Sequence, residues 1–506
     1  MTLFLIIISI VIFALTSNFF KNKKVFIALL IVAVLFCYFL LAKNFFYPET
    51  FLPSSKINTY YFCCNYYNLV TNAIKNKKLY ITTSKFYPKL ETDNIYKNYP
   101  ELFFADEKYQ SLFDTSYYKG KVYLYFGITP ILLFYLPFNL ITNLYLTDKF
   151  LVFILSCFIF LLSLFLIKNF IKDFNFNNKP PSVITILTVF LIGLCNYLPF
   201  LLIRNNIYEV LITTANLLLI LSFLFFYFYL KTKNNKKQYI LILLISLCLA
   251  LSVGARPYYV LHIPAFFILI TFLKYNQTKN IKELIKTAIT FLIPCLLYGT
   301  VVALYNYLRF DSIFEFGFKY TLNSENHYEQ FTSLKDVFLA IKYDLFQFPE
   351  INKNTFFSLV QTKGHLFGNE FVAGIIWTFP LIFLFVLIPK FLIDTFKQNK
   401  NIFYITILMV FVICINLFIT SFIGMVTRYF FEWMFFIVIL SIILFYYLYD
   451  KAKTKNLKNI LNIFFVLIFC YSVFINVCLL FCENNAMLFA KTNPENYIQA
   501  INFLFK

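Results

Sequence analysis

The sequence predicts an all-α, polytopic integral membrane protein with about 12 transmembrane helices, a re-entrant or broken helix pair and two larger external loops. Three observations support this fold class. Hydrophobic residues make up 60% of the chain and charged residues 13%, whereas soluble globular proteins average about 45–50% and about 25%. Apolar windows of about 20 residues, long enough to cross a bilayer as a helix, recur along the chain. The loops between these windows alternate in lysine content, as the positive-inside rule predicts.

The apolar windows define the predicted helices in order. The run at 3–13 has no charged segment before it and no small-residue cleavage site after it, so we expect a signal-anchor helix with its N-terminus outside. The candidate spans are residues 2–20, 25–46, 149–167, 183–203, 209–230, 238–254, 258–274, 287–305, 370–390, 402–424, 429–449 and 459–482. We see among them no inverted pair of interrupted helices of the kind that line substrate sites in secondary transporters.

The apolar stretch at 122–147 decides the orientation of all later helices. If it makes no net crossing, every lysine-rich loop falls on the cytoplasmic side. These loops are residues 168–179, 231–237, 274–286, 390–400 and 451–458. We therefore predict a re-entrant or broken helix pair at 122–147, interrupted by Pro130 and Pro137. Irregular backbone of this kind persists at membrane depth only when it is buried in protein or lines a cavity.

This organisation divides the chain into five consecutive segments. We expect an N-terminal helical hairpin at 1–46, a large external loop with the re-entrant segment at 47–148, and a transmembrane core at 149–305. A second external loop at 306–369 precedes C-terminal transmembrane helices and an external tail at 370–506. The chain as a whole is predicted to be a multi-pass protein of the inner (plasma) membrane.

The positive charge has a simple explanation in such a protein. Lys+Arg is 44 against Asp+Glu 24, a net charge of +20. In a soluble protein this excess would indicate nucleic-acid binding, but lysine-rich cytoplasmic loops account for it here. We therefore expect membrane lipid, and no nucleic acid, as a partner. The sequence contains no nucleotide-binding or zinc motif, so we expect no cofactor and no metal site; weak divalent-metal binding by the external acids is possible but not indicated.

The arginines are the first candidate site residues. The chain has four arginines beside forty lysines, and all four fall at the predicted outer ends of spans: Arg204, Arg256, Arg309 and Arg428. The planar guanidinium suits phosphate better than an ammonium group does. This pattern favours one anion-binding cradle at the outer leaflet. The alternative is that each arginine extends to lipid headgroups on its own.

Acids on the same side form the second candidate set. Asp114 lies in a mixture of hydroxyl, basic and aromatic side chains just before the re-entrant stretch, where a carboxylate can serve as a general base or orient a sugar hydroxyl; a capped turn is the alternative. Glu209 opens an apolar helix, which favours either a function or a simple interaction with the helix dipole. Glu432 follows Arg428 by one turn, which is typical of an intrahelical ion pair.

Several stretches resemble a known family of enzymes. They are DTSYYKGKVYLYFGITP at 114–130, NIYE at 206–209, GARP at 254–257, RFDSIFEFGFKY at 309–320 and RY at 428–429. The chain resembles the GT-C-type polytopic membrane glycosyltransferases, and within them the bacterial relatives of the protein O-mannosyltransferase and lipid A aminoarabinose transferase families. The resemblance runs from about residue 60 to 430 and so covers most of the chain.

The resemblance implies a function. Such enzymes move a sugar from a polyprenyl-phosphate donor to a glycan, lipid or protein acceptor at the external face. An acid in or beside the first external loop is catalytic, which implies Asp114 or Glu49 here. Basic residues hold the donor phosphate, which implies Arg256, Arg309, Arg428, Arg204 and Lys121. The pocket would then be lined by Tyr123, Tyr125, Tyr208 and Glu209.

One position departs from the family pattern. Asn65 occupies a place where such families often carry aspartate, and an amide cannot act as a base. Either another acid serves instead, or the protein is not a standard transferase. The alternatives are a flippase or transporter of polyprenyl-linked sugars, and a ligase or polymerase of lipid-linked glycans.

Overall fold

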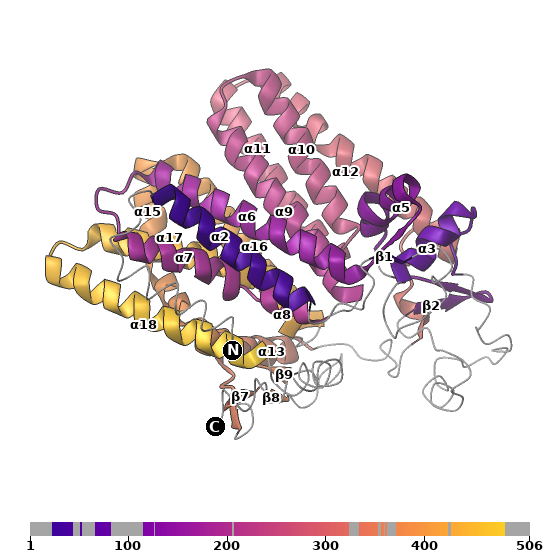
Figure 1. The fold of residues 1–506 in the computed structure, drawn as a ribbon. Coiled ribbons are helices and arrows are strands. Elements are labelled where there is room, and N and C mark those ends of the chain that lie inside the picture. The colour runs from indigo at the N-terminus through magenta and orange to yellow at the C-terminus, as the bar shows by residue number, and fades with distance from the viewer. Residues whose placement is uncertain are drawn as a thin grey trace. The chain divides into compact units, whose positions relative to one another are not determined.

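The protein is mainly helical, as predicted (Figure 1). The computed structural model describes residues 23–43, 51–52, 66–81, 115–125, 127–204, 207–322, 333–352, 356–358, 360–361, 371–423 and 427–480. These residues belong to two compact units that alternate along the sequence. The first unit draws on residues 1–45, 156–204 and 332–506, and the second unit on residues 46–155 and 205–331.

Helices of membrane-spanning length recur through the described part of the chain. Nine of them are long and apolar enough to cross a bilayer. They are Asp148–Phe174, Ser182–Ile203, Ile207–Lys231, Asn235–Val253, Pro257–Thr278, Ile281–Phe310, Lys400–Ile423, Arg428–Lys451 and Lys455–Leu480. Each coincides with a predicted span, so the protein is a multi-pass membrane protein. The predicted span at 2–20 lies outside the described residues, and the one at 25–46 is the helix α2 (Lys23–Lys43), with a shorter apolar stretch at Ile27–Ala42.

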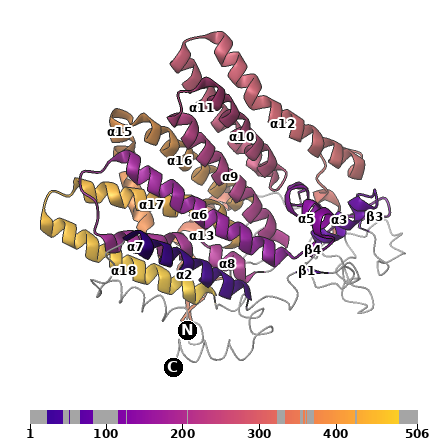
Figure 2. The same cartoon turned by 45° about the horizontal axis from the view of Figure 1, so that its top comes forward.

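Four helices form the body of the second unit. They are α9 (Ile207–Lys231), α10 (Asn235–Val253), α11 (His262–Thr278) and α12 (Ile281–Phe310), joined by short connections and lying side by side in Figures 1 and 2. Within the apolar window of α9, 83% of residues are buried in the protein, whereas only 11% are buried in that of α12. The helix α9 is therefore a core helix, whereas most apolar side chains of α12 face outward from the protein.

The segment predicted to be re-entrant forms two short helical pieces in the second unit. A π-helix at Ile131–Tyr135 continues into α5 (Leu136–Thr142), and Asn143 then ends the helix in a left-handed conformation with φ 57°. At 1.5 Å per residue these pieces extend about 18 Å, less than the roughly 30 Å of a bilayer core. The segment is thus a broken helix, and its helical part is too short to cross a membrane alone.

Small antiparallel sheets accompany these helices. The strand β2 (Thr115–Tyr118) pairs with β3 (Lys121–Tyr123) and with β5 (Thr321–Leu322). The turn between β2 and β3 consists of Lys119 and Gly120, both with positive φ, as a two-residue hairpin requires. The strand β1 (Phe51–Leu52) pairs with β4 (Tyr145–Leu146), and α3 (Tyr66–Lys75) contacts the π-helix. The chain that leaves β3 continues into the pocket described below.

In the first unit, α17 (Phe431–Lys451) is the central helix, because 94% of its apolar window is buried. It packs against α16 (Lys400–Ile423) and α7 (Ser182–Leu194). The helices α2 and α18 (Lys455–Leu480) also contact α7. The hydroxyl of Tyr38 in α2 donates to the Gly193 carbonyl at 2.6 Å, where a side chain on Gly193 would meet Val34.

Two predicted spans of the first unit are interrupted. The span at 183–203 breaks at Cys195–Tyr197 between α7 and α8 (Leu198–Ile203), with Tyr197 at φ 63°. The predicted single helix at 370–390 is replaced by four elements: β9 (Phe371–Val372), α14 (Ile375–Thr378), a 3-10 helix (Pro380–Leu387) and α15 (Ile388–Gln398).

Proline explains the second break, since the residue before a proline is driven away from the helical conformation. Phe379, directly before Pro380, has φ −147° and ψ 74°. The loop charges give the two interrupted spans opposite directions. The structure thus shows two interrupted spans, and the expectation that the chain has no inverted pair of such helices stays a prediction.

Candidate functional site

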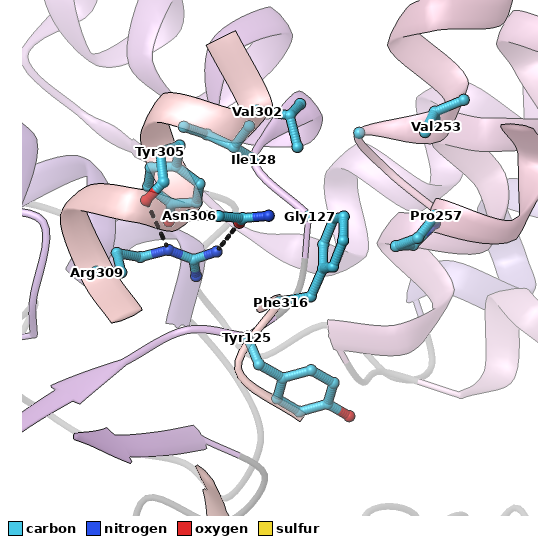
Figure 3. Close-up of a pocket in the computed structure, with 11 residues that line it drawn as sticks. Tyr125, Gly127, Ile128, Val253, Pro257, Val302, Tyr305, Asn306, Arg309 and Phe316 are labelled. Atoms are coloured by element: carbon cyan, nitrogen blue, oxygen red, sulfur yellow. Dashed lines mark hydrogen bonds between the residues drawn. The ribbon is translucent and has the colours of Figure 1, made fainter. Parts of the chain in front are cut away.

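A pocket lies in the second unit at the end that the loop charges place outside (Figure 3). Its walls come from three segments: the chain after β3, the connection after α10, and the last turns of α12 with the loop beyond. The lining residues are Tyr125, Gly127, Ile128, Val253, Gly254, Pro257, Val302, Tyr305, Asn306, Arg309 and Phe316. The room inside it is about 10 Å³, on the order of the space that one water molecule needs. In this state the pocket is nearly closed.

Two glycines allow the first two segments to meet at backbone distance. A Cβ atom on Gly127 would lie 1.9 Å from the Gly254 carbonyl oxygen, and one on Gly254 would lie 2.3 Å from the Tyr298 hydroxyl. The Thr129 backbone N–H donates to the Gly254 carbonyl at 3.2 Å. The Thr129 hydroxyl lies 2.7 Å from the Leu251 carbonyl and 2.5 Å from the Tyr298 hydroxyl. This contact fixes the turn that carries Arg256.

Arg309 in α12 is almost fully buried, with 3% of its surface exposed. Its guanidinium donates to the Tyr305 carbonyl at 3.3 Å, to Asn306 Oδ1 at 2.8 Å and to the Leu124 carbonyl. Figure 3 shows it between Tyr305 and Asn306, with the Tyr125 hydroxyl pointing away from it. Three of its five N–H donors therefore bind its own chain. Arg309 is a clamp between α12 and the segment after β3, and its predicted role as a phosphate ligand stays a prediction.

An acid and an arginine lie close to the same buried tyrosine. Tyr67 in α3 is fully buried and stacks on Tyr135, with ring centroids 5.1 Å apart. The Tyr135 hydroxyl donates to Asp148 Oδ1 at 2.5 Å. Burial raises the pKa of Tyr67 well above its usual value; the charge of Asp148 raises it further, and the charge of Arg256 lowers it. The charges of Asp148 and Arg256 therefore have opposite effects on the pKa of Tyr67.

This group adjoins the pocket, because Tyr125 and Tyr305 line the pocket and also act on Tyr67. Asp148 is 4% exposed and Arg256 8% exposed, and the Arg256 guanidinium lies over the Tyr258 ring at 5.2 Å. We call Tyr67, Asp148, Arg256, Tyr125 and Tyr305 the outer polar cluster. Arg309, also charged and buried, lies in the pocket wall itself.

Asp148 is the residue that sequence reasoning missed. It stands at the outer end of the predicted span 149–167 and directly follows the predicted re-entrant segment. A carboxylate at the end of a membrane span is costly and often functional, and this was the available signal. The same position is also that of an acid in the first turn of a helix, where the helix dipole alone accounts for it.

Two predicted residues near β3 occupy other surroundings. Tyr123 is buried, and its ring packs against Phe310 at 5.4 Å and Tyr80 at 6.4 Å. Lys121 is exposed, with its ammonium 5.0 Å from the centre of the Tyr80 ring. Neither side chain lines the pocket, whereas Tyr125 does.

The remaining predicted residues of α9 and of the first unit are described separately. Tyr208 is half-buried and Glu209 fully buried in the first turn of α9, outside the pocket lining. Arg204 and Arg428 belong to the first unit, where each lies over an aromatic ring, Phe200 at 5.5 Å and Tyr429 at 5.4 Å. A single cradle of four arginines stays a prediction.

Both predicted catalytic acids, Asp114 and Glu49, lie outside the described residues, as does Asn65. Within the described ranges no group of three His, Cys, Asp or Glu side chains has the geometry of a metal site. No protein-family model, curated protein or solved structure matches the chain. The functional argument therefore depends on the outer polar cluster and the pocket beside it.

Proposed function

We propose that the protein is a glycosyltransferase that moves a sugar from a polyprenyl-phosphate donor to an acceptor at the outer face of the plasma membrane. The observation that carries this proposal is that the second unit holds a buried acid and a buried arginine near one pocket. Asp148 accepts a hydrogen bond from Tyr135, which stacks on Tyr67, and Arg256 lies in the chain between the pocket residues Gly254 and Pro257. Transfer from a phosphate ester requires an acid and a cation, because one group accepts a proton and the other holds the leaving phosphate.

The proposed reaction assigns a role to each group. The acceptor hydroxyl oxygen forms a bond to the anomeric carbon, and the bond from that carbon to the phosphate oxygen breaks. The acceptor proton passes to a carboxylate, and polyprenyl phosphate leaves with the additional negative charge. Arg256 stabilises that charge as it develops. Asp148 is the candidate base within the described residues, and Asp114 and Glu49 stay candidates from the sequence.

The surface of α12 offers the donor a route to the pocket. Leu296, Leu297 and Leu308 are each about two-thirds exposed, at 66%, 66% and 65%. The pocket residues Tyr305 and Arg309 belong to the same helix. An apolar prenyl tail can therefore lie along α12 within the bilayer while its phosphate reaches the pocket from the side.

The test uses protein reconstituted in vesicles with a radiolabelled polyprenyl-phosphate hexose and candidate acceptors. Transfer predicts labelled product together with free polyprenyl phosphate. Arg256→Lys should lose most of the turnover, because an ammonium cannot make the two-pronged contact to phosphate. Lys119→Gln, an exposed cation of the same unit, should retain it. Full turnover in Arg256→Lys would overturn the assignment of the phosphate site.

A second candidate, a flippase or transporter of polyprenyl-linked sugars, is favoured by the two interrupted spans of the first unit. The Tyr197 hydroxyl lies 3.4 Å from Thr378 Oγ1, and Asn476 Nδ2 donates to the Thr378 carbonyl at 3.0 Å. Interrupted helices that meet in this way line substrate sites in transporters. In the same vesicles a transporter moves intact labelled donor to the opposite leaflet and releases no polyprenyl phosphate.

A further inference from the structure

The helix α13 (Leu334–Phe346) of the first unit has two contrasting faces. One face carries Val337, Ala340 and Asp344, which are all buried. The opposite face carries Leu334, Phe338 and Phe346, which are 65%, 65% and 55% exposed. The spacing of four residues and then eight places these three apolar side chains in one row along the helix, in which Lys342 stands between Phe338 and Phe346. A helix of thirteen residues is too short to cross a bilayer. The exposure of these apolar side chains therefore needs another explanation.

The depth of α13 follows from its contact with a membrane span. Ser421 Oγ donates to Asp344 Oδ2 at 2.9 Å. Ser421 lies two residues before the end of α16 (Lys400–Ile423), at the end that the loop charges place outside. The C-terminal part of α13 is therefore level with the outer end of a transmembrane helix. That level is the boundary between hydrocarbon and headgroups.

Aromatic side chains extend the stripe onto α14. The Trp377 indole N–H donates to the Phe346 carbonyl at 2.9 Å, and its ring packs edge-to-face on Phe348 at 4.9 Å. Trp377 is 37% exposed and Phe348 44% exposed. Tryptophan is enriched where one side of a residue meets lipid and the other meets water. We call Leu334, Phe338, Phe346, Phe348 and Trp377 the aromatic stripe.

Two lysines share this face. Lys335 and Lys342 are both exposed on α13, and Lys342 lies one helical turn from both Phe338 and Phe346. A lysine among apolar side chains lays its stem along them and extends its ammonium to the headgroups, and such helices are typical of attachment to anionic lipid. We propose that the aromatic stripe inserts into the headgroup layer of the outer leaflet, so that this part of the second external loop is seated on the lipid surface. The occupant is phospholipid, and the lysines select its anionic members.

The chain offers a direct probe, because it has two tryptophans. Trp433 is fully buried in α17, so the variant Trp433→Phe leaves Trp377 as the only tryptophan. Excitation at the long-wavelength edge, where tyrosine does not absorb, then reports Trp377 alone. In full-length protein reconstituted in vesicles, phospholipids brominated near the carbonyl end of the acyl chain should quench Trp377 strongly. Lipids brominated near the chain terminus should quench it less, and aqueous acrylamide should quench it weakly.

Two controls complete the design. Trp377→Phe retains only the buried Trp433, whose emission should change little with the position of bromine. Should Trp433→Phe fail to fold, the difference between wild type and Trp377→Phe isolates the same signal. Lys335→Gln together with Lys342→Gln should reduce the gain in quenching that phosphatidylglycerol produces over phosphatidylcholine.

Either of two results would overturn the proposal. Quenching by acrylamide as strong as that of free indole, with no effect of brominated lipid, would place the aromatic stripe in water. Protection from both quenchers would mean that protein, such as a second copy of the chain, covers it.

Discussion

Two buried aspartates, one in each unit, both accept a hydrogen bond from a hydroxyl group, but the charged groups that influence their surroundings differ. Asp148 of the second unit is 4% exposed and Asp344 of the first unit 2% exposed. Each accepts a hydrogen bond from one hydroxyl, of Tyr135 at 2.5 Å and of Ser421 at 2.9 Å. The charges of Asp148 and Arg256 shift the pKa of Tyr67 in opposite directions. Among the described residues no cation acts on Asp344, and burial raises its pKa to about 7.

This difference shows that burial of a carboxylate is not enough to make it a candidate catalytic residue. A guanidinium nearby favours the charged form of a carboxylate, which is the form that can accept a proton from a substrate. A buried carboxylate without a cation holds its proton up to a higher pH, and ionising it costs stability. The predictions below test this contrast, beginning with the largest effect.

Asp148→Asn should reduce sugar transfer by about 10²–10⁴-fold, the contribution of a general base. The amide keeps the size of the carboxylate and can still meet the Tyr135 hydroxyl, so the fold should survive. The measurement is product formation in vesicles, with the thermal unfolding profile as a check on folding. Unchanged turnover with every acceptor would remove Asp148 from the reaction and return the assignment to Asp114 or Glu49.

Asp344→Asn should change the pH dependence of stability instead. The pKa of Asp344 is raised from 3.8 to about 7 in the folded protein. The folded state therefore binds the proton more tightly, and stability falls as pH rises from about 4 to about 7. Three pKa units correspond to about 4 kcal/mol at most.

The asparagine variant should lose this slope and be the more stable protein at pH 7. Trp377 fluorescence during thermal unfolding at several pH values measures it, since Trp377 hydrogen bonds to α13. Glu350→Gln, an exposed acid of the same unit, is the matched control. An equal slope in wild type and Asp344→Asn would show that another group titrates.

Gly254→Ala tests whether the outer polar cluster depends on the backbone contact beneath it. The added Cβ would lie 2.3 Å from the Tyr298 hydroxyl and 2.5 Å from Thr129 Oγ1. Overpacking of this kind costs about 1–3 kcal/mol, and the shift should also move Arg256 and lower turnover.

The control for Gly254→Ala is Gly299→Ala in α12, where an added Cβ meets nothing within 4 Å. It should stabilise the helix by about 0.5–1 kcal/mol and leave turnover unchanged. If the two substitutions change turnover equally, the backbone contact at Gly254 does not contribute to the site.

The transmembrane helices could be predicted from sequence because length and hydropathy are local properties. The windows at 209–230 and 402–424 are helices within a few residues of their predicted ends. The window at 370–390 failed because hydropathy reports burial and not backbone conformation, and Pro380 breaks the helix. The proline itself indicates a break in the helix, but the prediction followed the length of the apolar window instead.

The site was harder to predict, because its contacts join distant residues. Arg309 was recognised as important, but its contact with the Leu124 carbonyl spans 185 positions, so no local pattern shows that it is a clamp. Asp148 becomes a candidate site residue only through its relation to Tyr67 and Arg256, which lie far from it in sequence. Taken alone, it is an ordinary acid at a helix N-terminus.

The smallest expected effect concerns a third aspartate, at the same end of the second unit. Asp311 follows α12 and is exposed; Lys119 Nζ lies 2.6 Å from its Oδ2, and the Tyr118 hydroxyl 3.1 Å from the same oxygen. Its hydrogen bond with Lys119 lowers the pKa of Asp311. The stability that this pair adds is present above the ordinary pKa and is lost as pH falls through the lowered one. Solvent screens an exposed pair, so Asp311→Asn should change neither unfolding nor turnover measurably.

Comparing Asp311→Asn with Asp148→Asn therefore shows whether turnover depends on the burial of the carboxylate or only on its presence at this end of the unit. Asp311 and Asp148 are acids of the same unit; Asp311 is exposed and pairs with Lys119, whereas Asp148 is buried and accepts a hydrogen bond from Tyr135. If the reaction needs a desolvated carboxylate, the asparagine at 148 is damaging and the asparagine at 311 is silent, in the same vesicles and with the same donor. A comparable loss of turnover in both variants would mean that the total negative charge at this end of the second unit matters. The buried cluster would then have no special role.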